Sequence, residues 1–284
     1  MNLKVIAYAR NGFTDKFGIP RQSREDSCIE TRIVFEPEYS VREALRGIEG
    51  FSHLWLLWGF DKVESRKTAS LKVESKDAIE GGELSWSPTV RPPRLGGNKR
   101  MGVFATRSPF RPNPIGLTSV KLIRVESRKS KVERQTIWEL VVTGADLLDG
   151  TPIYDIKPYL SFSDSHPEAK NGFAEETQEY QLKVDWGEAE VLSGTPPRGS
   201  TSDNLSMLSR CAPVVPPTPP YRELEEILSQ DPRPGYQDDP EREYKLDYAG
   251  WRVTFVVKEL TSEGMNELTN EGVVFVKKVE KVAN

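Results

Sequence analysis

The stretch FSHLWLLWGF, from Phe51 to Phe60, is the most apolar run of the chain and decides its fold class. Aromatic and leucine side chains follow one another, and a glycine precedes the run at Gly50. A short continuous apolar run of this kind is typical of a strand buried on both faces. We therefore predict such a strand here, with Trp55 and Trp58 as core residues and His53 as a hydrogen-bonding residue of the core.

On both sides of that run, short segments rich in branched and aromatic residues recur, with Gly, Pro and Asn clustered between them. The expected strands are Leu3–Arg10, Thr31–Phe35, Gly102–Thr106, Leu117–Val125 and Thr136–Thr143. One segment of this half, Ser40 to Ile48, has helical spacing, an N-cap serine and a glutamate three residues later. Many short strands with few helices predict a mainly β protein whose N-terminal domain is a small β-barrel or a sandwich.

A change of composition near Ser165 to Gly172 divides the chain, so we expect an N-terminal domain over residues 1–168 and a smaller one over 169–284. The second domain is expected to be α+β. Its expected elements are a strand pair in Gln178–Leu192, a helix at Tyr221–Ser229, and strands in Tyr244–Leu260 and Gly272–Val282. Two segments read as exposed loops: the Lys/Glu/Ser-rich Asp61–Glu83 and the Pro-rich stretch at about 193–220.

Length, composition and cysteine content narrow the class of protein further. The chain has 284 residues, 37% hydrophobic and 29% charged, which is enough apolar material for a core. It has no uncharged apolar run of about 18 residues and no secretory pattern, so we expect no membrane partner. Two distant cysteines, Cys28 and Cys211, indicate a cytoplasmic protein without a disulfide framework, and with two histidines they make no metal site.

Positive charge is concentrated in one segment of a chain whose net charge is −4. No acidic residue lies between Glu83 and Glu126. The basic residues there are Arg91, Arg94, Lys99, Arg100, Arg107, Arg111, Lys121 and Arg124. Such a tract predicts either an anion-binding face or a solvated loop balanced by neighbours, and charge alone leaves both open.

The heart of that tract, VRPPRLGGNKRMGVFATRSPFRPNPIG from Val90 to Gly116, favours binding. Prolines beside arginines keep the backbone extended, and arginine forks suit carboxylate or phosphate groups. Gly96 and Gly97 permit close approach of another group. Trp86, next to the tract, is a candidate for stacking on a nucleic-acid base.

A second polar pattern runs from Gly144 to Ser163, GADLLDGTPIYDIKPYLSFS. Asp149-Gly150-Thr151-Pro152 is a tight-turn sequence. Asp155, Lys157 and Tyr159 follow at a period of two, which places them on one face of a strand. They predict either an acid/base or positioning cluster, or an exposed face with one salt bridge. No G-x-G-x-x-G motif follows a strand, so the common nucleotide-binding folds have no support.

Taken together and in this order, four stretches resemble the TsaA-like (TrmO) family of tRNA methyltransferases. They are FGIPRQS (Phe17–Ser23), EALRGIEGFSHLWLL (Glu43–Leu57), TVRPPRLGGNKRMGVFATRSPFRPNPIGL (Thr89–Leu117) and LLDGTPIYDIKPYL (Leu147–Leu160). LSQDPRPGY (Leu228–Tyr236) resembles part of the family's C-terminal domain. Where family members commonly show His-Gln, this chain has Asp61-Lys62 and a long charged insertion.

The resemblance implies a β-barrel that binds S-adenosylmethionine, a small α+β C-terminal domain, and a homodimer. The implied reaction is N6-methylation of N6-threonylcarbamoyladenosine beside the anticodon of tRNA. The implied donor contacts are Pro20, Arg21, Gln22, Asp61, Lys62, Arg107, Leu117, Asp149, Gly150, Thr151 and Pro152.

On this reading, Asp155, Lys157 and Tyr159 are our hypothesis for the catalytic or orienting group. The residues expected to hold tRNA phosphates are Arg91, Arg94, Lys99, Arg100 and Arg111. Three alternatives remain open at this point. They are a methyltransferase for another acceptor, a non-catalytic module that binds S-adenosylmethionine, and a plain RNA-binding barrel.

Overall fold

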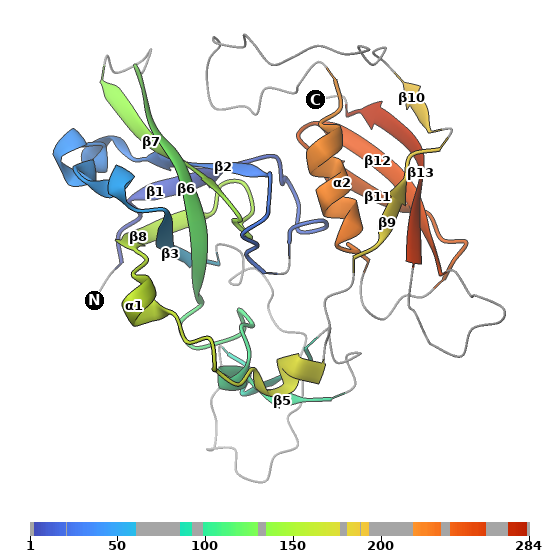
Figure 1. Ribbon diagram of the computed structural model, residues 1–284, viewed down its shortest axis with the longest axis horizontal. Helices are drawn as coiled ribbons and strands as arrows, with labels where there is room; N and C mark the ends of the chain where they lie inside the picture. Colours follow the sequence, from blue (N-terminus) through green and yellow to red (C-terminus); the bar gives the residue numbers. More distant parts are fainter. Residues whose placement is uncertain are drawn as a thin grey trace.

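The computed structural model describes residues 3–20, 22–60, 86–92, 99–129, 135–176, 181–187, 189–192, 218–233, 239–259 and 272–282. Figure 1 shows two β-rich parts side by side, a barrel built from the first half of the chain and a twisted sheet built from the last third. Within those residues, no helix has the length and apolarity needed to cross a membrane. The sequence boundary near Ser165–Gly172 stays a prediction.

The N-terminal part is a closed antiparallel barrel, which confirms the mainly β fold class and decides for a barrel over a sandwich. Its strands follow the order β1-β2-β7-β6-β3-β8 around the wall. Their bounds are β1 Ala7–Arg10, β2 Glu30–Phe35, β3 His53–Gly59, β6 Ile115–Lys129, β7 Thr136–Thr143 and β8 Pro152–Pro158. Closure gives each of these strands a partner on both sides.

Strand β3 supplies the centre of the barrel core. Leu54, Leu56 and Trp58 point inward and are buried with residues from every other wall strand. The intervening residues, Trp55 and Leu57 among them, are half-buried on the outer face. The expectation of a strand buried on both faces is therefore wrong, because this strand belongs to a barrel with one interior face.

The expected helix from Ser40 to Ile48 is also wrong. Three short 3-10 turns occupy this region, η1 Pro37–Tyr39, η2 Arg42–Leu45 and η3 Ile48–Gly50. The Ser40 hydroxyl does not cap a helix; it donates to the Thr136 carbonyl at 3.2 Å and accepts from the Trp138 N–H at 2.7 Å. Gly47, at φ +88°, then reverses the chain between η2 and η3.

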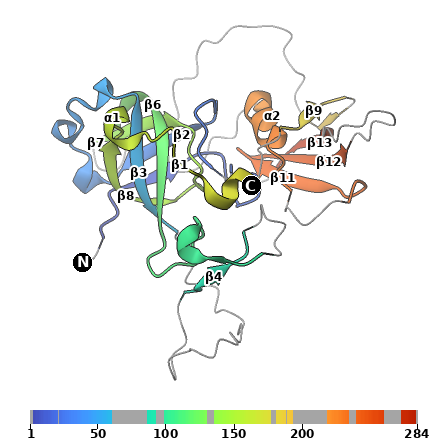
Figure 2. The same ribbon diagram turned by 60° about the horizontal axis from the view of Figure 1, so that its bottom comes forward.

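The segment Gly102–Thr106 forms only the end of a strand. β4 Thr89–Val90 pairs with β5 Met101–Gly102, and a 3-10 turn, η5 Val103–Ala105, follows. The hydroxyl and the N–H of Thr106 both bond to the Val103 carbonyl, at 2.9 Å and 3.1 Å, which closes that turn. Figures 1 and 2 both show this small hairpin projecting below the barrel.

The C-terminal part is a sheet of order β10-β13-β12-β11, with β9 also pairing with β13. The bounds are β9 Lys183–Asp185, β10 Glu190–Leu192, β11 Tyr244–Tyr248, β12 Trp251–Glu259 and β13 Gly272–Lys281. The expected pair in Gln178–Leu192 exists as two strands, but each pairs in parallel with β13 and not with the other. Two short helices, α1 Ser161–Asp164 and η6 Gly172–Glu176, precede this sheet.

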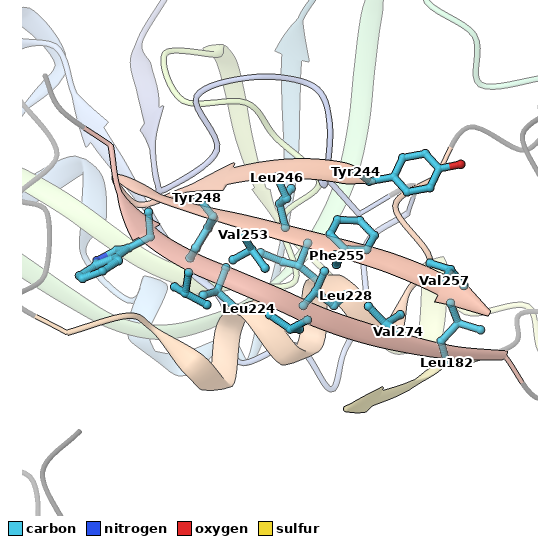
Figure 3. Packing of buried hydrophobic residues seen from close by; sticks show 14 of the residues in the cluster. Leu182, Leu224, Leu228, Tyr244, Leu246, Tyr248, Val253, Phe255, Val257 and Val274 are labelled. Atoms are coloured by element: carbon cyan, nitrogen blue, oxygen red, sulfur yellow. The ribbon is translucent and has the colours of Figure 1, made fainter. Parts of the chain in front are cut away.

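Helix α2, Tyr221–Ser229, has the bounds expected from its spacing and packs on one face of this sheet. Leu224, Ile227 and Leu228 are its buried face. Figure 3 shows Leu224 and Leu228 against the inward residues of the sheet, among them Leu246 and Val253. The buried residues of this α+β core differ from those of the barrel core, but they include Phe13 and Ile29 from the loop between β1 and β2.

Candidate functional site

The implied donor residues that the structure describes gather at one end of the barrel. At this end β1 stops at Arg10, β3 stops at Gly59, β6 begins at Ile115 and β8 begins at Pro152. Antiparallel pairing brings these strand ends together, so residues far apart in sequence become neighbours there. Arg21, Asp61 and Lys62, also implied as donor contacts, lie outside the described residues.

The loop that carries Gln22 lies against the wall beside β6 and β7. The Ser23 hydroxyl donates to the carbonyl of Ser119 on β6. Gly144, at φ +80°, ends β7, and a Cβ at this position would collide with the Arg24 carbonyl oxygen. Glycine is therefore required at 144 for the loop to sit this close. Arg107 then donates from Nη1 to Oε1 of Gln22 at 2.9 Å, which joins two implied donor residues.

A third polar group, Asp146, lies beside this pair. Asp146 Oδ1 accepts a 2.7 Å hydrogen bond from the Thr118 hydroxyl, which accepts one of 2.9 Å from the Trp58 indole nitrogen. Burial raises the pKa of Asp146, while the Thr118 hydrogen bond and the positive charge of Arg107 oppose that rise. A carboxyl held partly desolvated next to an exposed guanidinium is typical of a binding site for a polar ligand.

Asp146 was missed by the sequence-based prediction because nothing local marks it. Its neighbours Ala145 and Leu147 are buried core residues, so the segment reads as the end of an apolar strand. Asp146 lies just after the end of β7, and only the folded chain brings it within hydrogen-bond distance of Thr118 on β6.

The turn from Asp149 to Pro152 is a tight turn, as its sequence indicates, with Gly150 at φ +82°. The Asp149 carboxylate accepts from the Asn11 N–H at 3.0 Å and lies 3.5 Å from Arg10 Nη1. The N–H groups of Asp149, Gly150 and Thr151 donate to carbonyls of Phe13, Ala9 and Leu148. These N–H groups are thus engaged within the fold, and the Thr151 carbonyl accepts from the Ala9 N–H at 2.9 Å. A ligand would therefore meet the turn through the carbonyl oxygens of Asp149 and Gly150.

Asp155 and Lys157 lie on one outward face of β8, as their period-two spacing predicts. Lys157 Nζ is 2.9 Å from Asp155 Oδ2, and Asp155 Oδ1 accepts from the Ile156 N–H at 2.9 Å. In the barrel wall, Leu57 on β3 pairs with Asp155 of β8 on one side and with Leu117 of β6 on the other. Two strand spacings, roughly 10 Å, therefore separate Asp155 from the implied donor residue Leu117 on the same outer face.

Tyr159 lies further along this face, at the opposite end of the barrel wall from the donor residues. Its N–H donates to the His53 carbonyl at 3.0 Å, and its ring lies 5.5 Å from Trp55 and 6.2 Å from His53. The Trp55 indole donates to Asp164 at 2.8 Å. Tyr159 is thus part of an aromatic cluster beside Lys157, not a neighbour of Asp155. Trp55 and His53 belong to that outer cluster and not to the core.

The basic segment divides into exposed and engaged side chains. Arg91 and Lys99 are exposed on the β4–β5 hairpin. Arg100 is exposed but bonds to Thr89, with Nε 2.9 Å from Oγ1. Arg111 is half-buried and donates to the carbonyls of Thr106 and Ser108 at 3.1 and 3.2 Å, so it stabilises the loop that carries Arg107. Arg94 lies outside the described residues.

Aromatic rings stand beside these cations. The ring of Trp86 lies 5.9 Å from that of Phe104, a residue that is 71% exposed. An exposed aromatic pair next to arginines and lysines is typical of surfaces that bind unpaired nucleotides. Within the ranges that the structure describes, no three His, Cys, Asp or Glu side chains group closely enough to hold a metal ion.

Comparison with known proteins places both parts of the chain in one family. Residues 8–165 match the tRNA-methyltransferase O N-terminal domain, and residues 217–266 match the TrmO C-terminal domain. The chain is 37% identical over 253 residues to the tRNA (adenine(37)-N6)-methyltransferase of Escherichia coli K12, covering 89% of this chain and 90% of that protein. It is 40% identical over 209 residues to the enzyme of the same name from Eikenella corrodens, covering 74% and 92%.

Solved structures agree with the sequence relatives. A crystal structure of TrmO superposes with a TM-score of 0.59 at 26% identity, covering 98% of each chain. The barrel and the C-terminal sheet thus occur together in one known architecture. The chain belongs to the TrmO family of tRNA methyltransferases.

Proposed function

We propose that this protein is an S-adenosylmethionine-dependent tRNA methyltransferase that methylates N6 of N6-threonylcarbamoyladenosine at the position next to the anticodon. The observation that carries the proposal is the cluster of Gln22, Arg107 and Asp146 at the mouth of the barrel. Relatives that cover most of the chain are named tRNA (adenine(37)-N6)-methyltransferases, which supports the reaction and the nucleotide.

The cluster fits the donor chemically. S-adenosylmethionine, when bound, supplies an electrophilic methyl group and brings a carboxylate, an ammonium group and an adenine. The exposed Arg107 fork suits the carboxylate. Asp146 would face a cation, whose charge would offset the cost of keeping this partly buried carboxylate ionised. The carbonyl side of the Asp149–Pro152 turn would accept hydrogen bonds from the adenine amino group.

The acceptor would lie along the outer face of β8 and β3. The nitrogen to be methylated belongs to a urea-like group and is a weak nucleophile. Holding it in line with the methyl group would therefore provide most of the reduction in the activation barrier, about 7–11 kcal/mol in favourable cases. Asp155 would accept the hydrogen bond from that nitrogen, since its carboxylate is fixed by Ile156 and Lys157. Lys157, 62% exposed, would pair with the threonine carboxylate of the modified base.

The remaining assignments concern the bulk of the tRNA. Arg91, Lys99 and Arg100 would hold phosphates, with Trp86 and Phe104 stacking on exposed bases. Arg111 would act indirectly by holding the Thr106–Ser108 loop. Arg94 keeps its assignment from sequence alone.

The protein would act as a homodimer, as the family resemblance implies. Exposed apolar residues on β6 outside the implied donor contacts would supply a surface for a second copy: Ile115 is 40% exposed and Ile123 43%. Analytical ultracentrifugation tests this: the expected mass is about twice 32.1 kDa, and a single species at 32.1 kDa would contradict the dimer.

The experiment for the activity is a methyl-transfer assay with labelled S-adenosylmethionine and total tRNA, followed by nuclease digestion and mass spectrometry. We expect the label in one modified adenosine. Label in no nucleoside, at enzyme and donor concentrations that saturate binding, would exclude the proposed function. Asp155→Asn is the site control: it should lower kcat while donor affinity, measured by calorimetry, stays within about twofold of wild type.

A further inference from the structure

The loop between β1 and β2 carries two of the described donor residues, Pro20 and Gln22, near its middle, and the residues before them pack on the C-terminal core. Phe13 is fully buried there, with its ring 5.0 Å from that of Tyr248. The Phe13 carbonyl also accepts the Asp149 N–H at 2.9 Å. One residue thus joins the C-terminal sheet to the turn that is implied in donor binding.

A second contact comes from the hairpin between β11 and β12. Ala249 and Gly250 form its two-residue turn with φ of +49° and +79°, which suits a tight hairpin. The Ala249 N–H donates to the Gly12 carbonyl at 2.9 Å. A Cβ at Gly12 would lie 2.6 Å from Cε2 of Tyr248, so glycine at 12 lets the tyrosine ring reach the loop backbone.

The third contact lies closest to the donor residues. Gly18 has φ +94°, and a Cβ there would collide with Cδ1 of Leu246 and lie 3.3 Å from Cγ2 of Ile227. Its neighbours Phe17 and Ile19 pack against the same C-terminal core, and so does Leu148, next to Asp149. Figure 3 shows Leu246 and Tyr248 along β11, which presents both to the core that these loop residues join.

We propose that the C-terminal domain positions the methyl-donor loops, with Leu246 and Tyr248 as positioning residues for donor binding. The inference rests on the proposed function, because it gives that donor site a second support. Residues 14–20 contain no helix or strand. Without the C-terminal core, they would have to be ordered when the donor binds. Ordering a loop costs binding free energy, and a preformed loop avoids that cost.

The consequence is a specific kinetic signature. Loosening this packing should weaken donor binding, since Gln22 and the Asp149 turn would no longer be held in place. The described residues of the β4–β5 hairpin, Arg91 and Lys99 among them, do not belong to this C-terminal core, so tRNA affinity should be unchanged. A purely structural role of the C-terminal domain would instead reduce all parameters together through loss of folded enzyme.

The test compares Gly18→Ala with Gly47→Ala in the full-length protein. Both glycines have a strongly positive φ, +94° and +88°, but a Cβ at Gly47 would meet no atom within 4 Å. Backbone strain is therefore matched, and only Gly18→Ala pushes against Leu246. We expect Gly18→Ala to raise the Kd and KM for S-adenosylmethionine about tenfold, close to 1.4 kcal/mol, with the KM for tRNA within about twofold of wild type.

A second variant separates the loop packing from a general folding defect. Leu246→Val removes the Cδ1 atom that collides, so Gly18→Ala/Leu246→Val should recover donor affinity to within about threefold of wild type. Thermal unfolding of each variant verifies that the assays use folded protein. A second pair of variants, Gly12→Ala and Gly50→Ala, repeats the comparison of a crowded with an uncrowded glycine at two positions where φ is not positive.

Two outcomes overturn the proposal. One is a Gly18→Ala enzyme that binds donor as tightly as Gly47→Ala does; the other is a loss of donor affinity that Leu246→Val does not reverse. If the wild-type protein itself binds no S-adenosylmethionine, the proposed function fails and this inference with it. Wild-type binding with an unaffected Gly18→Ala variant removes the inference alone.

Discussion

The hydroxyl of Thr118 donates a 2.7 Å hydrogen bond to Oδ1 of Asp146 at the mouth of the barrel. Gly116 makes the arrangement possible, because a Cβ there would collide with the Trp58 ring that in turn bonds to Thr118. A carboxylate, a hydroxyl and an indole are thus held in series beside Arg107. The series costs stability through burial of Asp146, which is expected of a binding residue and not of a core residue.

That cost leads to a prediction for Asp146→Asn. Burial raises the pKa of Asp146 above its ordinary 3.8. When the pKa of a carboxyl group is higher in the folded protein than in the unfolded chain, its contribution to the free energy of unfolding is fully present below the unfolded-state pKa. That contribution is lost as the pH rises through the folded-state pKa. At pH 7 the ionised carboxylate therefore disfavours folding, and asparagine removes that cost while its oxygen still accepts from Thr118.

We expect Asp146→Asn to unfold at or above the wild-type temperature at pH 7, with the difference vanishing near pH 3.5, and to bind donor about tenfold more weakly. Thermal unfolding across this pH range and calorimetry measure both. A variant that unfolds below wild type at pH 7 but not at pH 3.5 would contradict the assignment.

Arg107 should matter for the donor and not for the fold. Its guanidinium is exposed and donates to Gln22, so Arg107→Ala leaves no buried group unpaired. A charge-assisted hydrogen bond to a carboxylate contributes about 1.5–3 kcal/mol, so the donor KM should rise about 10- to 150-fold. Arg42→Ala, at the opposite end of the barrel, is the matched control and should leave steady-state kinetics unchanged.

The sequence predicted some elements well because their signals are local. Helix α2 and strand β7 have the expected bounds, since each displays its own period of apolar residues. Asp155 and Lys157 share a face because strand geometry alone determines it. Ser40 was misread because its hydroxyl bonds to residues nearly a hundred positions away, and a cap-like pattern gives no sign of that.

The site could be predicted only in part for the same reason. The family resemblance led to Gln22, Arg107 and the Asp149 turn, whereas Asp146 acquires its role from its hydrogen bond with Thr118, which is distant in sequence. The packing of Gly18 against Leu246 joins residues from the two ends of the chain. Neither of these arrangements has a signature in the residues around it.

The Ser40 hydrogen bonds give a stability prediction that is independent of the site. Ser40→Ala removes two hydrogen bonds between the β2–β3 connection and β7, one of them from a strand N–H. We expect a loss of about 1–2 kcal/mol in the free energy of unfolding, measured by urea denaturation, with an unchanged donor Kd. Ser165→Ala, at an exposed serine, should change the unfolding free energy by less than about 0.5 kcal/mol.

The exposed cations of the β4–β5 hairpin should control the salt dependence of tRNA binding. Arg91→Ala/Lys99→Ala is expected to reduce the slope of log Kd against log salt by about 2, one unit for each phosphate that is no longer neutralised. Arg42→Ala/Arg46→Ala removes the same charge from the other end of the barrel. An equal slope change in both double variants would mean that net charge, and not this hairpin, accounts for binding.

Phe104 should contribute to tRNA binding through stacking. The residue is 71% exposed, so Phe104→Ala should change the unfolding temperature little. Removing a ring that stacks on a base typically costs about 1–3 kcal/mol, which corresponds to a 5- to 150-fold weaker tRNA affinity. Phe51→Ala, another exposed phenylalanine remote from the hairpin, is the control, and fluorescence anisotropy with labelled tRNA measures both.

The identity of the acceptor is decided by methyl transfer to two preparations of the same tRNA. One preparation carries N6-threonylcarbamoyladenosine beside the anticodon, and the other carries unmodified adenosine there. With labelled S-adenosylmethionine and wild-type enzyme, we expect label in the first preparation and none in the second. Equal labelling of both, or labelling of the unmodified tRNA alone, would contradict the proposed acceptor, because Lys157 would then have no threonine carboxylate to bind.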